Sequence, residues 1–131
     1  MIKGFTCGAF DLLHAGHVLM LKECKENCDY LVVGLQSDPS IDRKEKNKPI
    51  ETLEERIIKL NGSKYIDEIL IYDTEKDLYK MLQDLKPDIR FVGEDYKGKS
   101  FTGDGLPTKI HFNSRNHNYS STNLRERIKN Q

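Results

Sequence analysis

The sequence predicts an α/β fold, namely a doubly wound, mainly parallel five-stranded sheet with helices on both faces. Two observations predict it. Short apolar segments alternate with segments of helical periodicity along the whole chain. In addition, residues 30–35 read Tyr-Leu-Val-Val-Gly-Leu, a continuously apolar run typical of a strand buried on both faces. This alternation favours parallel strands joined by helices that cover both faces of the sheet.

The individual elements follow in order along the chain. Five strands are expected, at residues 2–7, 30–35, 68–72, 89–92 and 109–112, and four helices, at 16–26, 52–62, 74–85 and 122–129. Thr52 and Glu55 form a capping-box signature, Gly62 suits the end of that helix, and Pro87 halts the next one. Ligands bind such sheets at the carboxyl ends of the strands, so we expect the site in the loops after strands one, two, four and five.

Length and composition narrow the class of protein. The 131 residues fit one domain spanning 1–131, without repeat or linker. Basic and acidic residues number 21 each, so no global field favours a nucleic-acid or membrane partner. Without a signal peptide or a long apolar run, we expect a cytoplasmic protein. Cys7, Cys24 and Cys28 lack metal-finger spacing and are expected to be reduced thiols.

The first loop carries the strongest candidate chemistry. It reads Gly8-Ala9-Phe10-Asp11-Leu12-Leu13-His14-Ala15-Gly16-His17. His14 and His17 are three residues apart and would share one side of a helical first turn. Gly16 between them would let a phosphate approach the backbone, and the helix N-terminus would add free amides and a positive dipole end. Two other interpretations stay open for the pair, a metal site completed by Asp11 or ordinary helix-start residues.

The whole string resembles the HxGH-type nucleotidyltransferase superfamily, most closely its small cytidylyltransferases of the glycerol-3-phosphate cytidylyltransferase type. That family's pattern is GxFDLxHxGH, and every fixed position is matched here, by Gly8, Phe10, Asp11, Leu12, His14, Gly16 and His17. The resemblance implies a Rossmann-like fold, a homodimer, and transfer of CMP from CTP to a small phosphorylated alcohol with release of pyrophosphate. It implies Mg²⁺ on the triphosphate, with Asp11 a candidate metal contact. Nucleotide contacts are implied for Cys7, Gly8, Ala9, Phe10, Asp11, His14 and His17.

A basic loop follows the second strand and contains Arg43, Lys44, Lys46 and Lys48. A solvated surface loop is the usual explanation for such a run. At the ligand-binding end of a sheet, however, cations would neutralise charge on the moving phosphorus and the departing pyrophosphate. The resemblance implies phosphate contacts for Lys44 and Lys46, and an acceptor-binding role for Arg56 in its E-x-R setting.

Two later segments also resemble the family. Gly93-Glu94-Asp95-Tyr96 is similar to its GxDW or GxDY segment, which implies that Asp95 lies near the nucleotide; a turn carboxylate is the alternative. Residues 115–121 align with the family's R-T-E-G-I-S-T, which implies nucleotide contacts for Arg115, Ser120 and Ser121. The serines also suit the cap of the last helix. Residues 116–118 depart from the pattern, and His117 among them could hydrogen-bond the acceptor.

The resemblance leaves three functions to compare. His14, His17, Lys46 and Arg115 would stabilise transfer to the acceptor's phosphate, and Arg115 favours CTP. Adenylyltransferases acting on heptose phosphates share the GxFDLLHxGH start and a Y-S-T-T ending, which Tyr119-Ser120-Ser121-Thr122 resembles. They usually lack the arginine, and an ATP-dependent enzyme of that type is the alternative. An inactive nucleotide-binding regulatory module is a third possibility, which the complete set of cationic groups disfavours.

Overall fold

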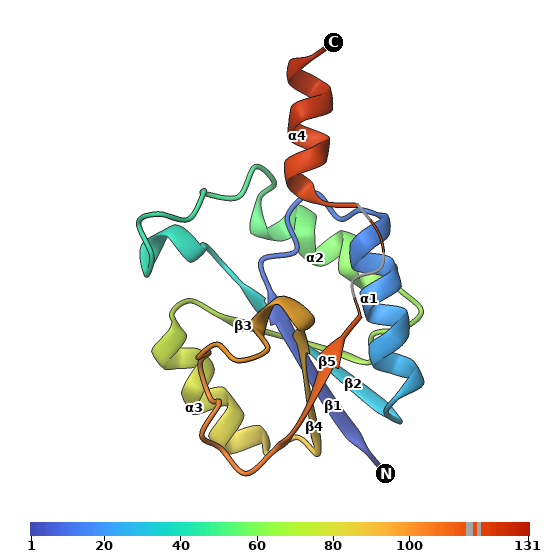
Figure 1. Ribbon diagram of the computed structural model, residues 1–131, viewed down its shortest axis with the longest axis vertical. Coiled ribbons are helices and arrows are strands. Elements are labelled where there is room, and N and C mark those ends of the chain that lie inside the picture. The colour runs from blue at the N-terminus through green and yellow to red at the C-terminus, as the bar shows by residue number, and fades with distance from the viewer. Residues whose placement is uncertain (115–116, 118) are drawn as a thin grey trace.

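The five predicted strands form one sheet in which every pair is parallel. The computed structural model describes residues 1–114, 117 and 119–131. The strands are β1 (Lys3–Gly8), β2 (Tyr30–Gln36), β3 (Glu68–Tyr72), β4 (Ile89–Gly93) and β5 (Lys109–Asn113), in the order β3-β2-β1-β4-β5. The chain winds outward from β1 to β3 and then crosses back to β4 and β5 (Figure 1). The strand order therefore reverses between β1 and β4, and the predicted doubly wound fold is confirmed.

Helices cover both faces of this sheet. They are α1 (Ala15–Glu26), α2 (Leu53–Asn61), α3 (Glu75–Leu85) and α4 (Ser121–Lys129), with single turns η1 (Pro39–Ile41) and η2 (Glu94–Tyr96). Leu31, Val33 and Leu35 of β2 pack in one core with residues of α1 and α2. Val32 points the other way and packs with Leu78 of α3 in a second core. The continuous apolar run of β2 thus reflects burial on both faces.

The helix boundaries follow local side-chain chemistry. Thr52 and Glu55 form the predicted capping box of α2, and Thr74 and Asp77 form an equivalent one at α3. Lys86 ends α3 in the left-handed region, with a φ of 48°, directly before Pro87. Observed and predicted boundaries differ by no more than one residue. At α2 and α3 the observed helix begins one residue later than predicted, because the capping threonine stands outside the helix that it starts.

The last helix has a different setting from the other three. In Figure 1, α4 extends away from the sheet, at the end of the molecule that carries the first loop. Its Arg125 forms an ion pair with the buried Asp11 at 3.1 Å. Within the described part of the chain, no helix has the length and hydropathy of a transmembrane span. All three cysteines are free thiols, as expected.

Candidate active site

The loop of residues 8–17, called the histidine loop, is fixed by hydrogen bonds between side chains and backbone N–H groups, which link it to the residues just before α2. Asp11 accepts from the backbone N–H groups of Ile50 and Glu51, each at 2.9 Å. The Leu12 N–H in turn donates to Glu51 Oε1 at 2.6 Å. Phe10 and Leu12, on either side of Asp11, have φ of 50° and 51°, a costly region for such residues. The reciprocal bonds hold this strained turn in place.

Arg56 lies beneath the same loop. Its side chain is only 2% exposed. The guanidinium donates to the carbonyl oxygens of Ala9 at 3.0 Å, Gln36 at 2.7 Å and Ser37 at 2.6 Å. Because these carbonyls would otherwise be buried without partners, Arg56 ties the loops after β1 and β2 together. These contacts give Arg56 a structural position, and its acceptor-binding role stays a prediction from the resemblance.

The two histidines form the cap of α1 with their own imidazoles. His17 Nδ1 accepts from the His14 backbone N–H at 3.1 Å, and His14 Nδ1 accepts from the Gly16 N–H at 3.0 Å. A nitrogen that accepts carries no proton, so each neutral ring is protonated at Nε2. The two ring centroids are 4.0 Å apart. The spacing predicted to place both side chains together does so, and the backbone fixes the tautomers.

The environment keeps His17 neutral. Burial lowers its pKa to about 4, and the neighbouring His14 pushes in the same direction, while Asp11 opposes the shift. Phe10, a buried core residue, lies beside the His17 ring with its centroid 5.5 Å away. Near neutral pH, His17 is therefore a neutral Nε2–H donor, which suits a hydrogen bond to a phosphate oxygen.

Gly16 is required by the packing of the imidazoles. A Cβ at this position would lie 2.8 Å from His14 Cε1, closer than real contacts allow, and a tight 3.0 Å from His117 Cε1. Any side chain at residue 16 would therefore have to displace the His14 ring. His117, expected to bind the acceptor, thus lies beside the motif histidines, where it stacks on Tyr119 with centroids 5.3 Å apart.

Two adjoining cavities open at the carboxyl ends of the strands. The histidine cavity, of about 330 Å³, is lined by His14, His17, His117, Ser120 and Ser121 among others. The central cavity, of about 520 Å³, lies at the switch point and is lined by groups following β1, β2 and β4. The two share Met20, Gly93 and Asn113. Together they form a cleft across the point where strand order reverses, as the sequence predicts.

The predicted residues distribute unevenly over this cleft. Cys7, Gly8 and Ala9 line the central cavity together with Lys46. Lys44 of the basic loop and Asp95 of η2 are exposed and contribute to neither lining.

The serines at the start of α4 have structural partners at the histidine cavity. Ser120 accepts from the Asn123 N–H at 3.1 Å as the helix cap, and Ser121 Oγ donates to the Asp11 carbonyl at 3.2 Å. The capping predicted for this hydroxyl run is therefore present, and it keeps both serines at the cavity wall. Arg115, expected to bind nucleotide, lies outside the described residues.

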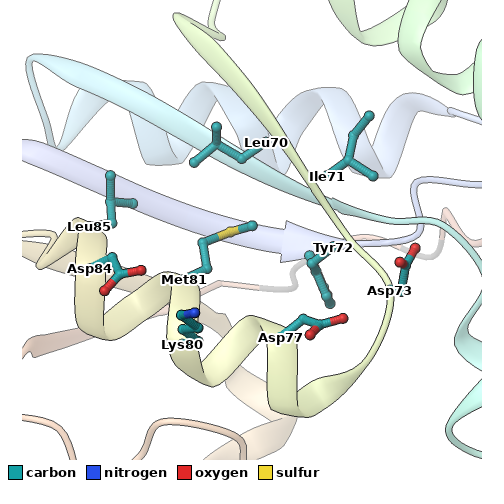
Figure 2. Close-up of a pocket in the computed structure, with 9 residues that line it drawn as sticks. All are labelled: Leu70, Ile71, Tyr72, Asp73, Asp77, Lys80, Met81, Asp84 and Leu85. Carbon is teal, nitrogen blue, oxygen red and sulfur yellow. The ribbon is translucent and has the colours of Figure 1, made fainter.

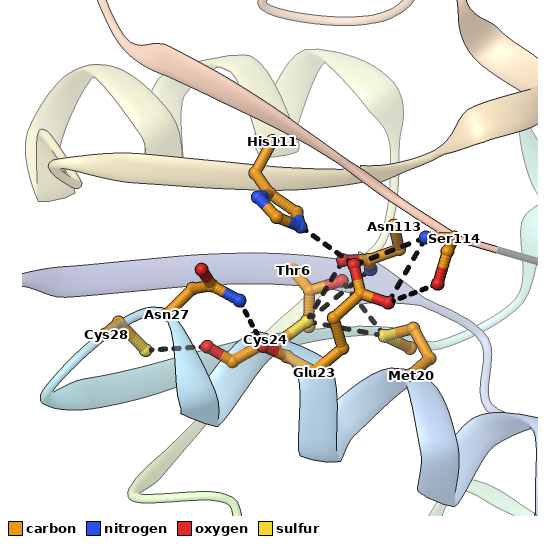
Figure 3. A network of polar contacts seen from close by, with 9 residues as sticks. All are labelled: Thr6, Met20, Glu23, Cys24, Asn27, Cys28, His111, Asn113 and Ser114. Atoms are coloured by element: carbon orange, nitrogen blue, oxygen red, sulfur yellow. Dashed lines mark hydrogen bonds and ion pairs between the residues drawn. The ribbon is translucent and has the colours of Figure 1, made fainter.

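A polar network fixes the point where the chain leaves β5 (Figure 3). Glu23 of α1 accepts from the backbone N–H of Ser114 at 3.2 Å and from its hydroxyl at 2.8 Å. Its other oxygen lies 2.7 Å from His111 Nε2. Neither Glu23 nor His111 was singled out from the sequence, because their pairing spans 88 residues and has no local signature.

Three further groups of the central cavity were missed from the sequence, namely Tyr72, Glu75 and Arg90. Tyr72 and Glu75 lie at and after the end of β3, whose loop was not expected to contribute. Arg90 is 5% exposed and stands between Ile89 and Phe91 in a central strand. A charged residue within such an apolar strand is the one signal that could have identified it.

Among the residues that the structure describes, neither a metal-binding cluster nor the third cavity is part of this cleft. In the described ranges, no group of three or more His, Cys, Asp or Glu side chains is placed to hold a metal ion. Asp11, the candidate metal contact, directs both oxygens to backbone amides and Arg125.

The edge cavity, of about 510 Å³, lies between β3 and α3 and contains Leu70, Met81 and Leu85 (Figure 2). It holds none of the predicted site residues.

Fold and site together define an α/β protein with a cleft at its topological switch point. The profile of the family described as Cytidylyltransferase-like matches residues 5–127. The bifunctional protein HldE of Campylobacter concisus (strain 13826) is 38% identical over 126 residues, which are 95% of this chain and 26% of that protein. HldE of Helicobacter pylori (strain HPAG1) is also 38% identical over 126 residues, which are 95% of this chain and 27% of that HldE protein.

Two solved structures are also similar to this chain. The lipopolysaccharide core biosynthesis protein from Thermoplasma volcanium GSS1 is 31% identical with a TM-score of 0.73, covering 89% of this chain and 99% of that one. Pantothenate synthetase from Thermus thermophilus, at 13% identity and a TM-score of 0.69, covers 98% of this chain and 64% of that one, and shares the fold. The chain belongs to the Cytidylyltransferase-like family of HxGH-type nucleotidyltransferases. It spans about a quarter of the length of the HldE proteins.

Proposed function

We propose that this chain transfers AMP from ATP to the phosphate of a phosphorylated sugar of the heptose phosphate type. The comparisons favour this alternative over the prediction of a CTP-dependent enzyme for a glycerol-3-phosphate-like alcohol. The relatives matched over 95% of the chain are HldE proteins. A protein of lipopolysaccharide core biosynthesis shares 31% identity over nearly the whole of its own length. Synthesis of a saccharide consumes activated sugars, so a sugar phosphate is the acceptor we propose.

The observation that carries the proposal is the pair of tautomer-fixed imidazoles at the start of α1. Transfer to a phosphate requires donors that stabilise charge on the α-phosphoryl group without reorganising as charge builds. The Nδ1 bonds of His14 and His17 provide such fixed donors at Nε2. The N-terminus of α1 adds its dipole at the same point.

The chemistry needs no protein nucleophile. An oxygen of the acceptor's phosphate attacks the α-phosphorus, forming a new P–O bond. The bond from the α-phosphorus to the bridging oxygen breaks, and pyrophosphate leaves with that electron pair. The protein's contribution is alignment and charge stabilisation. Mg²⁺ would enter with the triphosphate as part of the substrate, since Mg²⁺ is commonly bound through substrate phosphates.

The two cavities suggest how the substrates divide the cleft. We assign the nucleotide phosphates to the histidine cavity, where His14, His17 and the hydroxyls of Ser120 and Ser121 converge. We assign the acceptor to the central cavity, where Lys46 would face its phosphate. His117 then belongs to the nucleotide side, together with the stacked ring of Tyr119. The reacting groups would meet near Gly93, which lines both cavities.

The test is a matrix of nucleotides and acceptors. ATP, CTP, GTP and UTP with Mg²⁺ are each combined with a heptose phosphate, glycerol 3-phosphate, ribitol phosphate and phosphocholine, and pyrophosphate release is measured. ATP with the heptose phosphate should give the highest kcat/KM. A higher kcat/KM for CTP with glycerol 3-phosphate would restore the cytidylyltransferase prediction. Nucleotide binding without pyrophosphate release in any combination would support the regulatory module.

A further inference from the structure

We propose that Glu75 and Arg90 recognise hydroxyl groups on the sugar ring of the acceptor, an inference that rests on the proposed function. Glu75 Oε2 and Arg90 Nε are the buried side-chain polar atoms without a hydrogen-bond partner among the described residues. Both residues line the central cavity. Buried polar atoms are normally paired, and an unpaired one costs stability. Because two residues with such atoms line one cavity, we infer that a ligand in this cavity supplies the missing partners.

Glu75 is held by its other atoms, so that a single oxygen remains for a ligand. Its Oε1 forms an ion pair with Arg43. Its backbone N–H donates to Asp42 Oδ2 at 2.6 Å. Both partners belong to the loop after β2; the ion pair fixes the carboxylate, and the backbone bond fixes the start of α3 that carries it. Oε2 is thus the atom of Glu75 that is left to accept a hydrogen bond from a hydroxyl.

Arg90 is fixed in a comparable way. One terminal nitrogen donates to the Thr102 carbonyl, and the other lies 3.9 Å from Cys7 Sγ. The guanidinium also sits over the ring of Phe101, with its central carbon 5.0 Å from the centroid. With both ends held, the remaining Nε–H is a donor of fixed direction.

The pair of groups selects for hydroxyls rather than for phosphate. A carboxylate accepts hydrogen bonds and repels anions, while the guanidinium only donates. A hydroxyl both donates and accepts, so adjacent sugar hydroxyls satisfy the two groups together. Cys7 and Tyr72 complete this end of the cavity, and burial raises the pKa of both, which keeps them uncharged. Lys46 lines the same cavity, and its positive charge suits the phosphate of the acceptor. Sites built to pair a hydroxyl discriminate strongly against analogues that lack it.

The experiment uses Glu75→Gln, which keeps the shape and can still accept from Arg43 but turns an NH₂ donor toward the ligand. With saturating ATP, kcat/KM for the heptose phosphate should fall at least tenfold. That for phosphocholine, which carries no alcohol hydroxyl, should change less than threefold, and KM for ATP less than twofold. Asp84→Asn is the matched control, because Asp84 is on the same helix but lines the edge cavity. It should leave all these values unchanged.

Equal losses for the two acceptors would mean that Glu75 only positions the basic loop through Arg43, and would overturn the inference. Arg90→Lys keeps the charge and removes Nε–H, and should repeat the selective loss in a variant whose melting temperature confirms folding. If neither loss is selective, the inference also fails.

Binding measurements separate this inference from the proposed function. If the wild-type chain transfers no nucleotide to any sugar phosphate, the proposed function fails. Calorimetric titration with the heptose phosphate then tests hydroxyl recognition without catalysis. A Kd at least tenfold weaker for Glu75→Gln than for wild type would still support hydroxyl recognition. An unchanged Kd, or no binding to the wild-type chain, would overturn it.

Discussion

The histidine loop and the basic loop (residues 39–48) both follow central strands, yet they are held in different ways. Asp11, Leu12, His14 and His17 of the first loop all bond to backbone groups or to the adjoining start of α2. In the basic loop, Lys44 and Lys46 are exposed. That loop is attached to α3 through Arg43, which pairs with Glu75, and through Asp42.

The difference matches the tasks proposed for the two loops. Groups that stabilise a transition state must be fixed before the reaction, because reorganisation would consume their effect. Groups that attract a charged acceptor act over distance and tolerate exposure. Substitutions in the two loops should therefore differ in the size and the kind of their effects.

The largest effect should come from Arg56, on which the histidine loop rests. Arg56→Met leaves the buried carbonyls of Ala9, Gln36 and Ser37 without a donor, and should lower the free energy of unfolding by about 3 kcal/mol. Urea denaturation followed by circular dichroism measures it. Arg127→Met, at an exposed position of α4, is the control and should stay within about 0.5 kcal/mol of wild type. A loss below about 1 kcal/mol for Arg56→Met would contradict the structural role.

The second effect is a pH dependence of stability caused by His17. Its pKa is about 4 in the folded chain, against 6.5 for the ordinary side chain. Between these values the unfolded chain binds a proton that the folded chain does not, so stability falls as pH falls. From about pH 7.5 to about pH 5 the loss should be about 2 kcal/mol.

His17→Gln removes this titration, so the variant should lose correspondingly less stability over the same interval. Unfolding free energies at several pH values give the comparison. Parallel curves for the two proteins would show that His17 is not the group responsible.

The third effect concerns catalysis by the same histidine. His17→Ala removes a fixed Nε2–H donor and should lower kcat at least tenfold, or about 1.4 kcal/mol of transition-state stabilisation. The fold should persist, with a modest loss from the missing cap. Steady-state pyrophosphate release gives kcat. A kcat close to wild type in a folded variant would reduce the histidine pair to a helix-start feature.

The smallest effect should distinguish two lysines of the basic loop. Lys46 lines the central cavity, whereas Lys44 does not. Lys46→Ala should raise KM for the sugar phosphate about fivefold, and Lys44→Ala less than twofold. The effect of Lys46→Ala should shrink as salt rises, because an exposed charge is screened. Equal effects of the two substitutions would mean that the loop acts only through its total charge.

Local patterns were enough for the fold and for the centre of the site. The alternation of strands and helices, the capping box of Thr52 and Glu55 and the spacing of His14 and His17 depend on neighbours within a few residues. The structure confirms the parallel sheet, the helices on both faces and the convergence of the histidines. The structural contacts of Arg56 were not predicted, because its carbonyl partners lie 19 to 47 residues away.

The sequence by itself therefore determined where the strands and helices run and which loop brings the two histidines together, because both depend on periodicity and on spacing within one turn. Only the tertiary structure decided which polar groups share the central cavity. Glu75 and Arg90 come from different elements, and Arg90 lies within an apolar strand. Their unpaired atoms become visible only when long-range packing buries the rest of each side chain. Burial and pairing are properties of the assembled chain, and a linear pattern does not contain them.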